Sequence, residues 1–239
     1  MKKITFLLFG VFLLFLTNGD RSYANTEEGK YLSEDVITFL TGRDFVTAHV
    51  ILNRDYDVEN LTEEELNILA ATILNDIYNS KFEDVQPFYS PNLPLANRLN
   101  KKEIALAALN PYEATHVYFC TDIAETAAID IFLAGNADDT NANAFKHAYW
   151  NALMSRNIGV NAAEKWATAH EYDNPNALST EMDLINNIHG RTAYEVLAKN
   201  NSWPSDYTTE VYILFRLDSG YLIRIVNGKL AVTDNTGKR

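Results

Sequence analysis

The sequence predicts a mainly α-helical protein, a helical bundle with a small C-terminal antiparallel β-meander, which makes the fold class α+β. Apolar residues recur at helical spacing in several segments before residue 200. Loops rich in Asn, Asp and Gly, such as "GNADDTNAN" and "YDNPNALST", separate these segments. After residue 208, β-branched and aromatic runs alternate with turn residues, which is typical of short strands.

Residues 1–24 have the order of a cleaved secretory signal peptide. A short basic start precedes an apolar run from Ile4 to Leu16, and a polar stretch then ends in a small-x-Ala sequence at Ala24. The apolar run is shorter than the about 20 residues that span a bilayer, although an uncleaved anchor is the alternative. The sequence therefore predicts a secreted or cell-surface bacterial protein whose mature chain begins at Asn25.

The charge of the chain argues against nucleic acid as a partner. The 239 residues carry a formal net charge of −12, and removing residues 1–24 takes away three positive charges and one negative charge, so the mature chain carries −14. Such a surface repels nucleic acid and anionic membranes unless a basic patch overrides it, and no later run of Lys or Arg supplies one. Cys120 is the only cysteine, so no intramolecular disulfide is possible.

Residues 25–86 are expected to form an N-terminal helical region. Its clearest helix follows Thr62, a good N-cap residue, and Glu65 three residues later completes a capping box. Residues 87–98 contain three prolines, which exclude regular structure and indicate a linker.

Residues 99–200 are expected to form a helical core domain, and residues 201–239 a three-stranded meander with a tail. The strand boundaries are placed at Asp218-Ser219-Gly220 and at Asn227-Gly228. Asn-Gly between apolar runs is a strong hairpin signal.

The first candidate site helix lies in "NAFKHAYWNALM". Asn143 and His147 are four residues apart, and Trp150 and Met154 continue the same stripe. His147 could be a ligand, or it could be an interior histidine with satisfied hydrogen bonds.

The second candidate helix ends in "AAEKWATAHE", where His170 and Glu171 are adjacent. Imidazole and carboxylate groups suit a metal, and they could equally act as a base and the group that orients it. The second histidine of the H-E-x-x-H zinc motif is missing, so the pair alone is a weak signal.

The third candidate helix lies in "EMDLINNIHGR", where Asp183, Asn187 and Arg191 follow one another at intervals of four. Such a stripe could simply be a solvated face. However, the adjacent asparagines and Gly190 are all unfavourable in a helix interior. Local conflicts of this kind tend to mark functional or closely packed positions.

Together these three motifs resemble an uncharacterised bacterial domain found in secreted proteins and at the C-termini of wall-associated and Rhs-repeat proteins. The resemblance extends from about Asn110 to Ala198 and implies a role related to toxin-type hydrolases. The sequence departs from that pattern at Asn143, where aspartate is common, and at Lys146, where arginine is common. Ile185 replaces a frequent histidine, and His189 stands at a position that is usually apolar.

Two hypotheses about function remain open. In the first, the protein is a secreted hydrolase in which one divalent metal ion is held by His147, His170 and Asp183. Glu171 is then the general base, Asn143 belongs to the site, and Asn187 and Arg191 orient an anionic substrate. The suggested substrate is a phosphodiester, as in phospholipid, or a cell-wall component.

A metal-free variant of this hypothesis uses His170 as a general base oriented by Asp183, although no serine or cysteine is evident as a nucleophile. In the second hypothesis, the protein is a non-catalytic secreted or cell-wall-associated module, and its polar cluster is a buried network that fixes the register of the helices.

Overall fold

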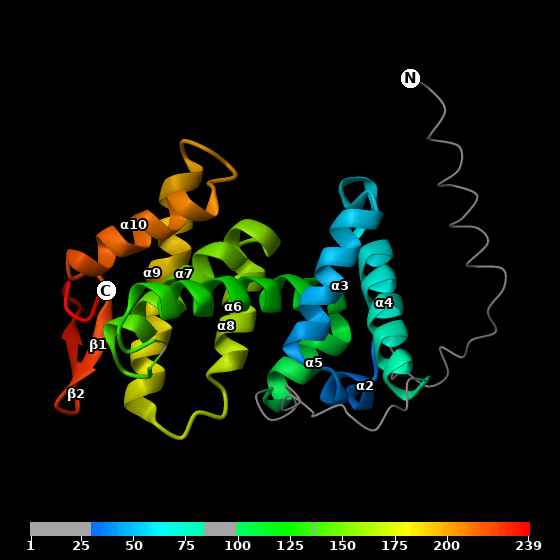
Figure 1. Ribbon diagram of the computed structural model, residues 1–239, viewed down its shortest axis with the longest axis horizontal. Helices are drawn as coiled ribbons and strands as arrows, with labels where there is room; N and C mark the ends of the chain where they lie inside the picture. Colours follow the sequence, from blue (N-terminus) through cyan, green and yellow to red (C-terminus); the bar gives the residue numbers. More distant parts are fainter. Residues whose placement is uncertain (1–29, 84–98, 136) are drawn as a thin grey trace.

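A computed structural model describes residues 30–83, 99–135 and 137–239 of the chain. Within these residues the protein is mostly helical and ends in a two-stranded antiparallel sheet, so the predicted fold class is confirmed (Figure 1). The helices and strands are α2 (Glu34–Phe39), α3 (Gly42–Asp55), the 3-10 helix η1 (Val58–Asn60), α4 (Glu63–Glu83), α5 (Lys101–Leu109), α6 (Pro111–Ile131), α7 (Asn141–Ile158), α8 (Val160–His170), α9 (Ala177–Ala198), α10 (Asp206–Asp218), β1 (Ile223–Val226) and β2 (Lys229–Val232).

Polar residues that cap the helix ends set where several of these helices begin. Before α4, the Thr62 backbone N–H donates to Glu65 and the Glu65 N–H donates to the Thr62 hydroxyl, which confirms the predicted capping box. Asn100 and Glu103 form a second box at the start of α5. Thr140 and Asn176 cap α7 and α9 through their side chains. Each cap satisfies backbone donors that the first helical turn leaves free.

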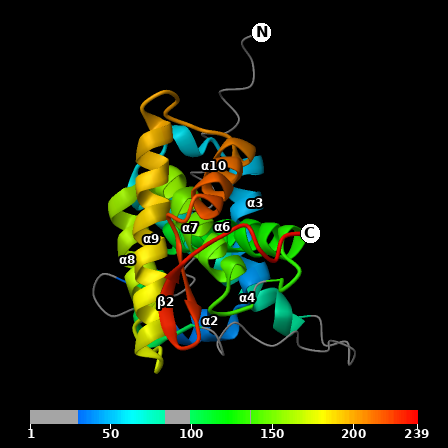
Figure 2. The same ribbon diagram turned by 90° about the vertical axis from the view of Figure 1, so that its left-hand side faces the viewer.

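Helix α7 is the centre of the molecule. It is buried along almost its whole length, and α6, α8, α9 and α10 all pack against it. Figure 2 shows α8 and α9 side by side on one side of the bundle. Because α7 is enclosed on several sides, its polar residues face neighbouring helices and must find partners there.

Helices α7 and α9 approach each other closely at Gly190. A Cβ atom at this position would lie 2.1 Å from the Ala148 carbonyl oxygen and 2.9 Å from the Asn151 Cβ. No side chain fits there, so this glycine allows the backbones of α7 and α9 to meet. The predicted conflict at Gly190 is therefore explained by close packing.

Helices α2, α3 and α4 lie at one end of the long axis, opposite the β-hairpin (Figure 1). Helix α3 packs on α6, and α2 packs on α5. Buried side chains from Leu32 to Leu222 form one hydrophobic core that includes both the N-terminal helices and the central bundle. The N-terminal helices therefore form part of the same core as the central bundle.

The prediction of three C-terminal strands is wrong in one respect. The segment expected to be the first strand is helix α10, which begins after the N-cap Ser205 and buries Thr209, Ile213 and Leu217. These buried residues are four apart, a helical spacing that the β-branched and aromatic composition concealed. The predicted hairpin is confirmed: β1 pairs with β2, and Asn227 and Gly228 both have positive φ.

The predicted signal peptide (residues 1–24), the mature start at Asn25 and the proline-rich linker (residues 87–98) all fall outside the described residues. Among the helices that the structure does describe, none is both long and apolar enough to cross a membrane.

Candidate functional site

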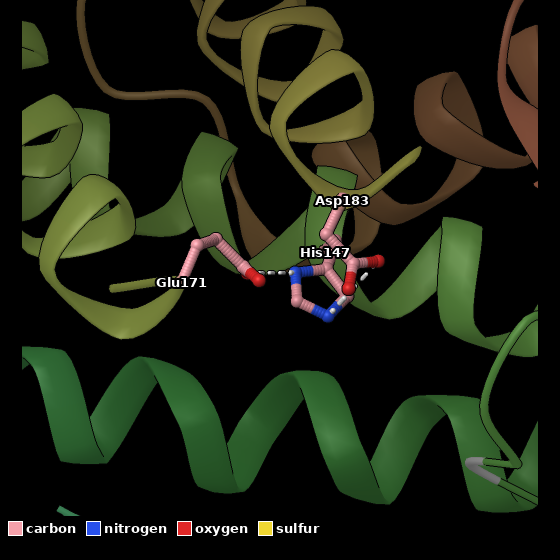
Figure 3. A group of neighbouring side chains, drawn as sticks. All are labelled: His147, Glu171 and Asp183. Atoms are coloured by element: carbon pink, nitrogen blue, oxygen red, sulfur yellow. Dashed lines mark ion pairs between the residues drawn. The ribbon is translucent and has the colours of Figure 1, made fainter. Parts of the chain in front are cut away.

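Three side chains from separate parts of the bundle meet beside α7. His147 projects from α7, Glu171 from the turn after α8, and Asp183 from α9, and all three are buried (Figure 3). One ligand atom from each lies within 4.8 Å of the others. We call these residues the carboxylate–histidine group. Imidazole nitrogen and carboxylate oxygen are suitable ligands for divalent zinc or manganese, so this group could hold a metal ion.

The two carboxylates approach different nitrogens of the His147 ring. Asp183 Oδ1 lies 3.4 Å from His147 Nε2, and Glu171 Oε1 lies 3.8 Å from Nδ1. Ligands at about 2.1 Å from a tetrahedral ion stand about 3.4 Å from one another. The separation of His147 Nε2 and Asp183 Oδ1 therefore suits a shared ion, whereas Glu171 lies beside the other ring nitrogen and would have to turn toward the Nε2 side to join them.

Asparagines hold this group in place. Asn143, one turn before His147, donates from Nδ2 to Asp183 Oδ1 at 2.9 Å. Asn187 Oδ1 lies 3.3 Å from His147 Nδ1 and accepts from Asn151 Nδ2 at 2.7 Å. Because an amide oxygen only accepts, this contact places the proton of the neutral ring on Nδ1 and leaves the lone pair of Nε2 toward Asp183.

Without a bound metal, burial favours the uncharged forms of the three residues in the carboxylate–histidine group. Burial holds the pKa of His147 well below its ordinary value, and the neighbouring charges of Lys146 and His170 lower it further. Burial, and then the charge of Glu171, raise the pKa of Asp183 to about 8. Burial also raises the pKa of Glu171, although the charge of His170 opposes this shift. At neutral pH the imidazole is therefore uncharged and Asp183 retains its proton, which a bound cation would displace.

The group has unused hydrogen-bonding capacity. Glu171 Oε1, Asn143 Oδ1 and Asn187 Nδ2 are buried and have no hydrogen-bond partner among the described residues. Buried polar atoms without partners cost free energy, so a closed structural network would be expected to satisfy them. Two of these three atoms are oxygens that can coordinate a cation or accept from a water molecule bound to it.

A pocket with a volume of about 390 Å³ opens beside His147. Its walls come from α3, α5, α6, α7 and the end of α8, and they include Val117, Trp150 and His170. Glu171 and Asp183 do not line this pocket, so a ligand in it reaches the carboxylate–histidine group past the His147 ring. The volume is within the range of small-molecule sites.

His170 belongs to this pocket rather than to the carboxylate–histidine group. Its Nδ1 lies 2.9 Å from Glu103 Oε1, and its side chain is 45 % exposed. Partial burial lowers the pKa of His170, but the hydrogen bond and the charge of Glu103, with a further contribution from Glu171, raise it above the ordinary value overall. A histidine oriented by a carboxylate and facing a pocket is suited to proton transfer.

The structure redistributes the roles predicted for the adjacent pair. His170, predicted as a metal ligand, turns toward Glu103, and Glu171, predicted as the general base, stands with His147 and Asp183 instead. The reason is geometric: successive residues of a helix point about 100° apart, so the two side chains leave the end of α8 in different directions. Asp183 likewise does not orient His170, because Glu103 does.

Arg191 was predicted to orient the substrate, but it contacts the site only through another side chain. Its Nη1 donates to Asn151 Oδ1 at 3.0 Å, and its Nη2 lies 3.8 Å from Glu164. Arg191 therefore supports the site through Asn151 and does not line the pocket. Asn187 is fully buried against His147, so it positions the ring and is not available to bind a substrate.

Asn186, the first of the adjacent asparagines in the third motif, points away from the site. Its side-chain amide accepts from the Ile223 N–H at 2.9 Å and donates to the Ile223 carbonyl at 2.8 Å, as a neighbouring strand would. The adjacent asparagines of α9 therefore have two tasks: Asn187 holds His147, and Asn186 holds the hairpin.

Sequence reasoning missed Glu103, which comes from outside the three motifs. Its Oε1 pairs with His170, and its Oε2 accepts from the Asn100 backbone N–H. The Asn100 side chain also donates to the carbonyl oxygens of Ala169 and His170, at 2.5 and 3.1 Å. The signal that could have found Glu103 is the Asn-x-x-Glu capping box before the apolar run of α5.

Comparison with known proteins adds one similarity. Residues 104–214 match a family described as a domain of unknown function (DUF6973). This match is slightly less than half of the chain; it contains α6 to α9 and all three members of the carboxylate–histidine group. No curated protein and no solved structure matches the chain.

Proposed function

We propose that this protein is a secreted hydrolase whose reaction is assisted by one divalent metal ion held by His147, Glu171 and Asp183. The observation that carries this proposal is the buried carboxylate–histidine group with unpartnered oxygens, beside a pocket that His147 lines. The resemblance to C-terminal domains of wall-associated and Rhs-repeat proteins supports a hydrolytic reaction, since such domains are often toxins.

A bound divalent ion would lower the pKa of a water molecule and stabilise negative charge on the substrate. The residues of the chain have separate tasks in this proposal. Asn143 and Asn187 hold Asp183 and His147 in register. His170, whose pKa Glu103 raises, protonates the leaving group from the pocket side.

Burial of the group favours a second hypothesis, in which it is structural. The side chains of His147, Glu171 and Asp183 are only 5–8 % exposed, and the helices around them are closely packed. In that case the protein is a non-catalytic secreted or wall-associated module, and the network fixes how α7, α8 and α9 pack.

Metal titration of the purified protein separates the two hypotheses. We expect one zinc or manganese ion per chain in the wild type, measured by calorimetry and by mass-spectrometric metal analysis. Asp183→Asn should lose this uptake, and Glu181→Gln, an exposed carboxylate on the same helix, should retain it. Absence of metal uptake by a folded wild type would reject the metal-assisted reaction, and a large loss of stability in His147→Ala would then support the structural network.

A further inference from the structure

The pocket beside His147 contains a lysine that forms no ion pair with the described residues. Lys146 lines the pocket from α7, is half-buried, and makes no hydrogen bond or ion pair with any residue in the described parts of the chain. Other partly buried cationic side chains form ion pairs, such as Arg156 with Asp206 and Arg224 with Asp234. A half-buried, unpaired ammonium group loses hydration without gaining an ion pair.

The positive charge of Lys146 acts directly on the site. It lowers the pKa values of His147, Glu171 and Asp183, although burial has a larger effect on each of these groups. Of the carboxylate–histidine group only His147 lines the pocket, so an anion there would lie beside Lys146 and the His147 ring. The chain has a net charge of −12, so attraction of an anion to the pocket depends on local cations such as Lys146.

The other charged residues of the pocket wall lie on different helices according to their sign. Arg43, exposed at the start of α3, adds a second cation without an ion pair in the described residues. Asp122 and Glu125 line the α6 side, and Glu103, which pairs with His170, lines the α5 side. An anionic group is therefore favoured near α3 and α7, and the part of a ligand that lies against α6 has to be neutral or positively charged. Val117 and Trp150 add apolar surface to the pocket wall.

We infer that the substrate is a phosphate ester with a neutral or cationic alcohol portion, and that Lys146 binds its phosphate group in the pocket beside the carboxylate–histidine group. This inference rests on the proposed function for the reaction, but the binding of the anion does not depend on it. We choose phosphate over a singly charged anion such as a carboxylate because the ammonium group of lysine is a compact donor that commonly binds phosphate.

The reaction on such a substrate is a simple hydrolysis. The oxygen of water forms a bond to phosphorus, and the bond between phosphorus and the alcohol oxygen breaks. The electron pair of that bond leaves with the alcohol oxygen, which takes a proton from His170. A proton from the attacking water returns to His170, so the products are a phosphate with one fewer ester link and a free alcohol. Lys146 contacts the phosphate throughout and transfers no proton.

Phenylphosphonate tests the binding step separately from the reaction, because its carbon–phosphorus bond is not hydrolysed. Its affinity is measured by calorimetry for the wild type, Lys146→Met, Lys146→Arg and Lys165→Met, each with and without added zinc or manganese. Lys165 is an exposed lysine on α8 that does not line the pocket, so it is the matched control. Benzyl alcohol serves as the neutral ligand and benzoate as the carboxylate ligand.

We expect Lys146→Met to weaken phenylphosphonate binding about tenfold or more, with Lys146→Arg and Lys165→Met close to the wild type. The loss should also appear in the metal-free protein, which distinguishes this inference from the metal-assisted reaction. Equal affinity of the wild type and Lys146→Met, or no binding by the wild type, would overturn the inference. Tighter binding of benzoate or benzyl alcohol than of phenylphosphonate would overturn the choice of a phosphate ester.

Discussion

Replacing Gly190 with alanine should destabilise the protein and weaken metal binding at the same time. The new Cβ would lie 2.1 Å from the Ala148 carbonyl oxygen, whereas real Cβ atoms essentially never approach another atom within 3.0 Å. The Ala148 oxygen is part of the α7 backbone, and the new Cβ is fixed directly to the α9 backbone. No change of side-chain rotamer can therefore relieve the clash. Helices α7 and α9 therefore have to separate by about 1 Å at this point.

The expected magnitude follows from two opposing effects. Overpacking in a core costs about 1–3 kcal/mol, and a backbone contact that cannot relax belongs at the upper end of that range. Alanine is favoured over glycine in a helix interior by about 1 kcal/mol, which offsets part of the cost. We therefore expect Gly190→Ala to lower the free energy of unfolding by about 2 kcal/mol.

Denaturant unfolding followed by circular dichroism measures this change, and metal titration provides the second readout. Separation of the helices moves Asn187 away from His147 and Asp183 away from His147, so we expect weaker metal binding in the folded variant. Ile188→Ala, an exposed position on the same helix, is the control and should change neither quantity by much. A Gly190→Ala variant that is as stable as the wild type would refute the close contact between α7 and α9.

Three further predictions concern other parts of the molecule. Burial lowers the pKa of His116 to about 3, so its protonation opposes folding and stability should fall as the pH drops below about 6.5. By linkage this amounts to about 2 kcal/mol at pH 5, and His116→Phe should remove that part of the slope in unfolding measured between pH 7 and 5. Glu103→Gln should lower the pKa of His170, seen by NMR titration of its imidazole, and an unchanged pKa would contradict the pairing. Asn186→Ala should cost about 1–3 kcal/mol and speed amide exchange of Ile223, because both backbone bonds to the hairpin are lost; unaltered exchange would argue against this anchor.

Local signals in the sequence predicted much of the helical fold. The capping box at Thr62 and Glu65 forms as expected, because both of its partners are within one helical turn. The segment that became α10 was predicted as a strand because its residues favour strands locally. Packing of Ile213 and Leu217 against the bundle decides for a helix, and this tertiary contribution is not visible in local propensity.

The three motifs contain the polar residues of the candidate site, but their spacing did not predict how the helices face one another. Spacing placed His147 and Asp183 each on one face of its own helix, and the packing of α7 against α9 brings the two side chains together. His170 and Glu171 lie where α8 ends, and a rotation of one residue exchanges which of them faces α7. Glu103 could not be assigned from the three motifs, since its contact with His170 joins positions 67 residues apart.

Because of the position of Glu171, a bound ion would change the local stability of one turn more than that of the central helices. His147 and Asp183 stand on helices enclosed by other helices, where amide hydrogen exchange requires extensive opening of the structure. Glu171 instead begins an exposed turn that leads from α8 to α9. Coordination would join this turn to the most protected helix of the bundle and would raise the free energy of its local opening. Metal binding should therefore slow hydrogen exchange and increase protease resistance in residues 172–176. It should change exchange in α7 little, because α7 is already enclosed by other helices.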